Sequence, residues 1–237
     1  MSLEAFPTDW QRALVVVAHP DDMEYGGAAA VARWTGEGRH VSYLLATRGE
    51  AGIDGMDPAE AAHVRDGEQR ESCRLVGVDT LDWLDHPDGL VEYGLPLRRD
   101  IAGAIRRRRP EVVVTVNHRE TYGPGALNMA DHRVVGQATI DAVRDAANRW
   151  LFRDLVDEAW AGVRYVAVVA SPQPTHAVDV TDTFEQGVAS LRAHSAYLAG
   201  LGEHPMADPE PFLRQMAMAT GEQAGADLAV AFELFRL

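Results

Sequence analysis

The 237-residue chain contains no lysine, since all 22 of its basic residues are arginine, and these face 36 acidic residues. The resulting formal net charge of −14 argues against a nucleic-acid-binding protein, because such a surface normally carries a basic patch. The one basic run, Arg106 to Arg109, ends a predicted helix just before Pro110. Cations at that end complement the helix dipole, so we interpret the run as structural.

Cysteine and long apolar runs are also scarce. The single cysteine, Cys73, excludes an intrachain disulfide and fits a reducing compartment. No apolar stretch approaches the roughly 20 residues that span a bilayer, and residues 1–10 lack the apolar core of a signal peptide. We therefore expect a cytoplasmic protein that acts on a small molecule and makes no contact with membrane or nucleic acid.

Apolar residues make up 46% of the chain, and we find no composition shift, repeat or long linker. We therefore expect one α/β domain over residues 1–237. Alternating strands and helices predict a mostly parallel sheet with helices on both faces. The expected strands are 13–18, 40–46, 80–84, 111–116, 164–170, 176–180 and an edge strand 228–236; the expected helices are 23–36, 58–76, 95–109, 131–150, 184–198 and 211–220.

The first expected strand runs without alternation from Ala13 to Ala18 and stops at His19-Pro20-Asp21-Asp22. Open α/β sheets bind ligands at the carboxyl ends of their strands, and polar groups there need a partner. One imidazole and one carboxylate suit Zn²⁺, although a catalytic zinc usually takes three protein ligands. The alternative is that an aspartate caps the following helix and that His19 bonds to backbone.

A third ligand is available at His132, which follows the expected strand 111–116 and the Gly- and Pro-rich loop 117–127. Its place at a helix start puts it at the same edge of the sheet. By composition alone, Asp131-His132 is equally the pattern of a helix cap beside a solvated histidine.

The glycine pair Gly26-Gly27 also raises nucleotide binding as a function. However, Asp21, Asp22 and Glu24 occupy the place where phosphate would lie, and the chain has no G-x-G-x-x-G motif. These carboxylates would repel a phosphate group, which argues against nucleotide binding.

Taken together, several blocks resemble the LmbE-like/PIG-L family of zinc-dependent N-deacetylases over about the first 140 residues. These blocks are Ala18 to Glu24, Gly26-Gly27, Thr47 to Gly52, Arg65 with Glu68, Gly77-Val78 and Asp131-His132. The resemblance implies a Rossmann-like fold, one Zn²⁺ held by His19, Asp22 and His132, and Asp21 as general base. It also implies substrates that carry N-acetylglucosamine, and it is compatible with a homo-oligomer, which no sequence feature demonstrates.

Granted a metal, the chemistry can be argued from the residues. Zn²⁺ lowers the pKa of bound water towards about 7, so a carboxylate can take its proton and allow attack on an amide carbonyl. Asp21 is adjacent to a ligand and free for that role. It could then return the proton to the leaving amine.

Met129 stands where many members of the family have a histidine close to the developing oxyanion. Methionine donates no hydrogen bond, so we consider either an active deacetylase with another donor or an altered, inactive metal-binding protein. For Met129 itself, packing at the helix start and a wall shaped for the substrate are equal explanations. The candidate donors are Tyr122, Asn128, His118 and His194. Among them we favour His194, because Ala193-His194-Ser195 resembles the family's His-x-Ser segment.

Further candidates surround this site. Asp131 could orient a ligand histidine, and Arg48 and Arg65 could bind a hydroxyl-rich or anionic substrate through their guanidinium groups. An ion-pair network with Glu50 and Glu68 is the alternative for the two arginines. The candidate substrate-binding residues are Arg48, Arg65, Glu24, Tyr122 and Asn128. The glycine-rich segment 49–56 is expected to be a mobile loop over the site.

Overall fold

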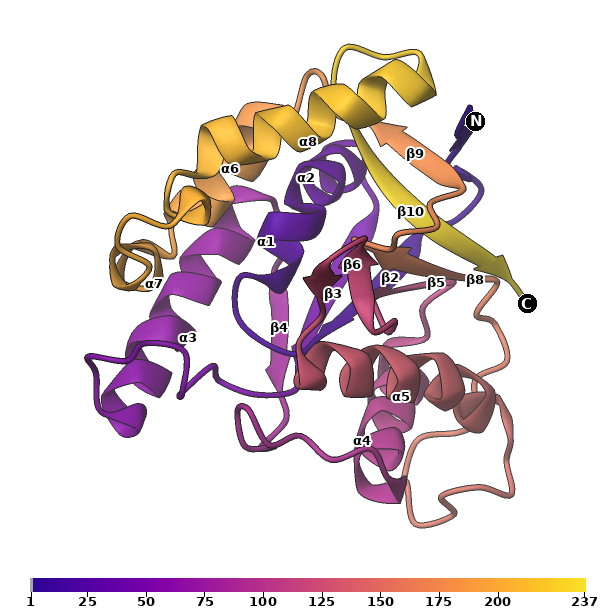
Figure 1. Cartoon of the computed structure of the whole chain (residues 1–237). Helices are drawn as coiled ribbons and strands as arrows, with labels where there is room; N and C mark the ends of the chain where they lie inside the picture. Colours follow the sequence, from indigo (N-terminus) through magenta and orange to yellow (C-terminus); the bar gives the residue numbers. More distant parts are fainter. Residues whose placement is uncertain (1) are drawn as a thin grey trace.

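A computed structural model describes residues 2–237 and places eight strands in one sheet, in the order β1-β9-β10-β8-β5-β2-β3-β4 (Figure 1). The strands from β8 to β4 are parallel to one another, whereas β10 is antiparallel to both β8 and β9. A separate short hairpin is formed by β6 and β7. The strands are β1 Glu4–Ala5, β2 Arg12–Val17, β3 His40–Leu45, β4 Thr80–Trp83, β5 Val112–Val116, β6 Thr121–Gly123, β7 Ala126–Leu127, β8 Tyr165–Val169, β9 His176–Asp179 and β10 Ala229–Arg236.

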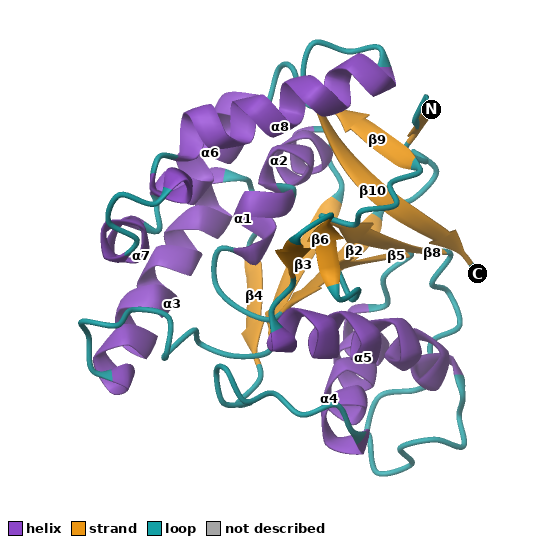
Figure 2. Ribbon diagram, viewed as in Figure 1, coloured by secondary structure: helices purple, strands orange, loops and turns teal. Residues whose placement is uncertain are grey.

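Helices cover both faces of the sheet (Figure 2). In one view α4 and α5 lie on one side, and α1, α2, α6 and α8 lie on the other (Figure 1). The helices are α1 Asp22–Gly26, α2 Ala28–Gly36, α3 Pro58–Leu75, α4 Leu95–Arg108, α5 Ala130–Ala147, α6 Phe184–Arg192, α7 Ser195–Gly200, the 3-10 turn η1 Pro205–Ala207 and α8 Pro209–Ala224. The predicted α/β class, with a mostly parallel sheet between helical layers, is confirmed. Within the described residues, no helix combines the length and the apolarity needed to cross a membrane.

The unalternating apolar sequence of β2 is explained by burial on both faces. Leu14 and Val16 pack into a core cluster with residues of α4 and α5, whereas Val15 and Val17 join a second cluster with residues of α2 and α6. A strand between two helical layers needs apolar side chains at every position, unlike a strand with one solvated face. This placement fixes the carboxyl end of β2, where the polar segment begins, near the centre of the sheet edge.

The structure corrects several expected boundaries. The expected helix 23–36 is broken at Gly27, and the expected helix 184–198 is broken around His194, giving α6 and α7. A Cβ on Gly26 would lie 2.9 Å from Val169, so the absence of a side chain lets this break approach β8.

The prediction of an edge strand at 228–236 is wrong. Strand β10 lies inside the sheet between β8 and β9, and β1 forms that edge instead. Residue pattern alone does not set strand order, because an antiparallel return can insert beside any strand that has a free edge. The loop expected at 117–127 holds the hairpin β6-β7.

Gly136 brings α5 against β5, because a Cβ at this position would lie 2.6 Å from the carbonyl oxygen of Val116. We predict that Gly136→Ala lowers the free energy of unfolding by about 1–3 kcal/mol, since the helix must move away from the strand. Gly67→Ala in α3 is the matched control: apart from the adjacent backbone of its own helix, no atom of residues 2–237 lies within 4 Å of a Cβ built there, so we expect stabilisation of about 0.5–1 kcal/mol. Urea unfolding measures both, and equal changes in the two variants would contradict the packing argument.

Candidate metal centre and active-site cavity

The polar segment starts where β2 ends. Asp21 has a φ of 85°, a left-handed conformation that is uncommon outside glycine. This kink lets Asp22 begin α1 and fold back on the strand, where its Oδ2 accepts hydrogen bonds from the backbone N–H groups of Ala18 and His19, both at 2.9 Å. One oxygen of Asp22 thus fixes the end of the strand, and Oδ1 is left to face the site.

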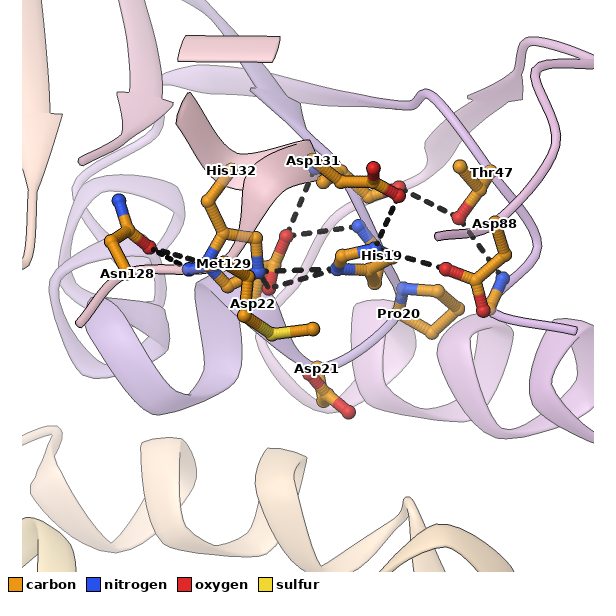
Figure 3. Close-up of polar contacts among 12 residues, drawn as sticks. His19, Pro20, Asp21, Asp22, Thr47, Asp88, Asn128, Met129, Asp131 and His132 are labelled. Atoms are coloured by element: carbon orange, nitrogen blue, oxygen red, sulfur yellow. Dashed lines mark hydrogen bonds and ion pairs between the residues drawn. The ribbon is translucent and has the colours of Figure 1, made fainter. Parts of the chain in front are cut away.

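The first turn of α5 brings His132 to the same place. His132 Nε2 lies 2.9 Å from Asp22 Oδ1 and 3.1 Å from His19 Nδ1, and His19 Nδ1 lies 3.7 Å from Asp22 Oδ1 (Figure 3). All three side chains are buried. Two imidazole nitrogens and one carboxylate oxygen at these separations are a donor set that a single metal ion can join, as expected from the sequence.

Each histidine is oriented by contacts to the ring nitrogen that points away from Asp22. His19 Nε2 lies 3.0 Å from Asp88 Oδ1 and 3.2 Å from Asp131 Oδ2, so in the neutral tautomer that carries its proton on Nε2 the N–H donates to these carboxylates and the Nδ1 lone pair is available to a metal ion. Burial opposes a charge on His19, but Asp22, Asp131 and Asp88 raise its pKa well above the usual range. A ligand histidine held by a carboxylate in this way is a common arrangement in metal sites.

His132 is held through its other ring nitrogen, Nδ1, and not through Nε2 as His19 is. Its Nδ1 lies 3.2 Å from Asn128 Oδ1 and 2.5 Å from the Tyr122 hydroxyl, which leaves Nε2 directed at Asp22. Asn128 is itself fixed, because its amide donates to the carbonyls of Asn117 and Arg119. Asn128 therefore positions His132 and does not line the cavity described below.

Asp131 lies behind His19, where it also accepts the backbone N–H groups of Gly89 and Val91. Asp88, on the same loop, accepts the N–H of Ala51 and thereby joins the segment 49–56 to the site. Sequence reasoning missed Asp88. A signal for it exists, because His86-Pro87-Asp88 follows strand β4 as His19-Pro20-Asp21 follows β2.

Asp21 lies apart from the histidine pair (Figure 3). Its Oδ2 accepts a 2.6 Å hydrogen bond from Arg65 Nη2. Burial raises the pKa of Asp21 well above its usual range, although the Arg65 guanidinium opposes this shift. This direction of shift favours the protonated carboxyl, which makes Asp21 a candidate for proton transfer beside the candidate metal ligands.

Arg65 is buried and lines the cavity, and it also donates to the carbonyls of Gly49 and Pro20. Much of its hydrogen-bonding capacity is thus used within the protein, so its clearest role in the structure is to hold Asp21 and segment 49–56. Arg48 does not line the cavity. It lies 3.4 Å from Asp66 and stacks on Trp83, so the alternative of ion pairing describes it, with a partner other than the expected Glu50 or Glu68.

Glu24 is buried and lines the cavity, but its Oε1 accepts hydrogen bonds from Gln69 and Ser72. Burial raises the pKa of Glu24, and these two donors oppose the shift. Glu24 therefore belongs to a buried polar layer under the site as well as to the cavity wall.

The structure separates the four candidate oxyanion donors. Tyr122 lines the cavity, whereas His118, Asn128 and His194 do not. His194 is fully buried, 3.9 Å from Glu24, and neither of its ring nitrogens makes a hydrogen bond to any atom of residues 2–237. The structure does not bring His194 to the cavity. Met129 does line it, with 56% of its surface exposed.

These residues surround one end of a cavity of about 850 Å³. This volume lies near the upper end of the roughly 300–1,000 Å³ typical of small-molecule sites. The candidate metal ligands His19, Asp22 and His132 border this space together with Asp21 and Tyr122, so the cavity has room for a sizeable ligand beside the candidate metal site.

The comparisons with known proteins agree with this geometry. The family model of PIG-L, described as GlcNAc-PI de-N-acetylase, matches residues 14–143, more than half of the chain. The chain belongs to the PIG-L family. The predicted enzyme class, a de-N-acetylase and hence an amide hydrolase, is confirmed with it.

Individual relatives of this PIG-L protein extend the match beyond the family model. A diacetylchitobiose deacetylase from Thermococcus kodakarensis is 29% identical over 92% of this chain and 80% of its own. A 1D-myo-inositol 2-acetamido-2-deoxy-alpha-D-glucopyranoside deacetylase from Kineococcus radiotolerans is 33% identical over 58% of this chain and 46% of its own. The solved structure of N,N'-diacetylchitobiose deacetylase from Pyrococcus horikoshii superposes with a TM-score of 0.86 at 26% identity, covering 96% of this chain and 85% of the other.

We predict that Asp131→Asn in this PIG-L protein lowers metal affinity by about 10- to 100-fold, because the amide no longer accepts as a carboxylate from His19. Competition with a chelator measures the affinity. Asp141→Asn, on the same helix but in contact with Tyr93 and Gln137, is the matched control. Equal affinities in the two variants would refute the positioning role.

His194 makes stability depend on pH. Burial, aided by Arg65, lowers its pKa to about 3 from 6.5, so the unfolded chain binds more protons over this range and stability falls as pH falls. Between about pH 6.5 and pH 5 we expect this residue to cost about 1.5 kcal/mol of unfolding free energy. His194→Gln should reduce the pH dependence by that amount, whereas substitution of the exposed His63 by glutamine should not. Denaturant titrations at both pH values measure the unfolding free energy. If the difference between the two pH values were the same in His194→Gln as in the unmodified protein, this role of His194 would be ruled out.

Proposed function

We propose that this PIG-L protein removes the N-acetyl group from an amino-sugar-containing small molecule, with Zn²⁺ held by His19, Asp22 and His132 and with Asp21 as general base. The observation that carries the proposal is the buried triad at the end of a large cavity, with a second, separately held carboxylate beside it. The relatives named above as deacetylases of acetylated sugars support the substrate class. The boundaries of the domain are proposed to be residues 1–237.

The donor set fits Zn²⁺, since borderline-soft zinc accepts imidazole and carboxylate together and three protein ligands leave a position open for catalysis. When bound, the ion supplies a Lewis acid that acidifies water and polarises an amide carbonyl. It would also neutralise part of the charge of Asp22, Asp88 and Asp131, carboxylates that converge on His19 and His132.

Asp21 accepts a proton from the attacking water as the water oxygen bonds to the carbonyl carbon. It then gives this proton to the amide nitrogen as the C–N bond breaks, so that the free amine and acetic acid are released, and the acid ionises to acetate in water. Arg65 holds Oδ2 of Asp21 and leaves the other oxygen for this transfer. Charge on the carbonyl oxygen needs a donor other than Met129.

Tyr122 is the donor that the geometry favours. Its hydroxyl oxygen faces His132 Nδ1, so it can accept the imidazole N–H and direct its own hydrogen into the cavity. Burial and the carboxylates of Asp22 and Asp21 raise its pKa, which keeps the hydroxyl protonated. A protein that binds metal without turnover is the second candidate, and Met129 on the cavity wall is the observation that favours it.

We predict that Asp21→Asn retains zinc and loses at least about 100-fold in kcat, the contribution typical of a general base, whereas His19→Ala loses both zinc and activity. Metal analysis and amine release from N-acetylglucosamine and N,N'-diacetylchitobiose measure the two properties. Asp85→Asn, whose side chain is 95% exposed, is the control.

Near-normal turnover by Asp21→Asn would refute the general-base role. Stoichiometric zinc in the unmodified protein without turnover on a broad panel of N-acetyl sugars would favour the binding protein instead.

A further inference from the structure

The cavity extends well beyond the reactive end. Apart from tyrosines, the titratable side chains that line it come from the segment 19–24 and from Arg65, Asp88 and His132, all at the metal-binding end. The remaining wall is formed by glycine and apolar residues, with a few uncharged polar side chains. The cavity therefore has a charged end and an apolar end, which we call the apolar chamber.

Helix α8 supplies one wall of the apolar chamber. Phe212, Leu213, Met216 and Thr220 line it, and their spacing places them on one face of the helix. The facing wall includes Val230 of β10 and the end of β8. These segments of α8, β10 and β8 lie outside residues 14–143, which the family model matches.

Tyr25 joins the two ends. It lies on α1, three residues after the metal-ligand candidate Asp22, and its ring packs edge-on against Phe212 with centroids 5.8 Å apart. Its hydroxyl donates to the carbonyl of Met206, so the polar atom is satisfied and the ring is presented as apolar surface. A ligand held at the triad can thus continue past Tyr25 onto the face of α8.

We propose that the apolar chamber binds an alkyl or acyl chain carried by the amino-sugar substrate. This inference rests on the proposed function, and the continuity of the chamber with the triad in one cavity is what assigns the chamber to the substrate itself. An apolar wall is a poor environment for the hydroxyl groups of a second sugar, which would lose hydrogen bonds to water there. Methionines at positions 206 and 216 give the wall the adaptability that suits a flexible chain.

The chain could be attached as the aglycone or as the N-acyl group, and two pairs of substrates distinguish these sources. One pair is octyl against methyl N-acetyl-β-D-glucosaminide, and the other is N-octanoyl- against N-acetylglucosamine. Each buried CH₂ contributes roughly a factor of four, so we expect at least about a tenfold gain in kcat/KM for the octyl member of one pair. Ratios near one in both pairs, with measurable turnover of N-acetylglucosamine, would overturn the inference and leave the proposed function standing.

Binding provides a readout that does not need turnover. The zinc-loaded Asp21→Asn protein should bind the octyl glycoside or the N-octanoyl sugar at least about tenfold more tightly than its short partner in calorimetry. If the unmodified enzyme cleaves no amide but this preference persists, the proposed function fails and the chamber assignment holds. Equal affinities in both pairs would refute the assignment.

Two methionines on α8 provide a matched pair of variants. Met216 lines the chamber and is 44% exposed, whereas Met218 does not line it and is 53% exposed. Met216→Gln should reduce the octyl preference by about three- to tenfold, and Met218→Gln should leave it within about twofold of the unmodified protein. Because both side chains are substantially exposed, both variants should fold. Val230→Thr, a nearly isosteric change on the facing wall, should act like Met216→Gln, and equal effects of Met216→Gln and Met218→Gln would contradict the proposal.

Discussion

The two carboxylate oxygens of Asp22 connect the end of strand β2 to the two buried histidines. Oδ2 accepts the backbone N–H groups at the end of β2, and Oδ1 faces both histidines. Burial raises the pKa of Asp22, but His132 and His19 outweigh burial, and the net pKa is lowered. Because one carboxylate contacts both the backbone at the end of β2 and the two histidines, the position of the strand end determines the position of the candidate metal ligands. Helix α5, which carries His132, packs close against β5, and Gly136 allows this approach because a Cβ there would lie 2.6 Å from the carbonyl oxygen of Val116.

The neighbouring carboxylates of Asp21 and Asp22 must be kept apart, since two adjacent negative charges in a buried site repel each other. The left-handed conformation of Asp21 separates their directions, and each then has its own cation or donors. Arg65 pairs with Asp21, and the histidines pair with Asp22. Backbone strain of this kind persists only where surrounding contacts fix it, and it often marks a functional site. The two aspartates can therefore take different chemical roles although they are consecutive in the sequence.

The sequence was sufficient to predict the parts of the site that depend on contiguous segments. Unalternating β2 followed by His19-Pro20-Asp21-Asp22 placed these residues at a sheet edge, and a second strand-loop-helix unit placed His132 there. Arg48 could not be assigned in this way, because whether it reached the cavity or Asp66 depended on the direction of a long side chain. His194 was favoured as the oxyanion donor, but its segment resemblance carried no information on burial, and the structure buries the side chain at the break between α6 and α7, outside the cavity lining. The position of β10 depended on strand order, which residue patterns do not encode, and the apolar chamber depends on β10 in turn.

Met129 and the apolar chamber are two aspects of one cavity. A histidine at position 129 would add a donor and a polar surface, whereas methionine removes the donor and adds flexible apolar surface. The lost donor can be supplied by Tyr122, which is already held at the cavity by His132. The added apolar surface lies on the same cavity as Phe212, Met216 and Val230. We infer that Met129 and the apolar face of α8 favour the same kind of substrate, one that is polar at its amide and apolar elsewhere. On this proposal Met129 affects which substrate is bound, whereas Asp21 and the candidate metal ligands supply the proposed chemistry.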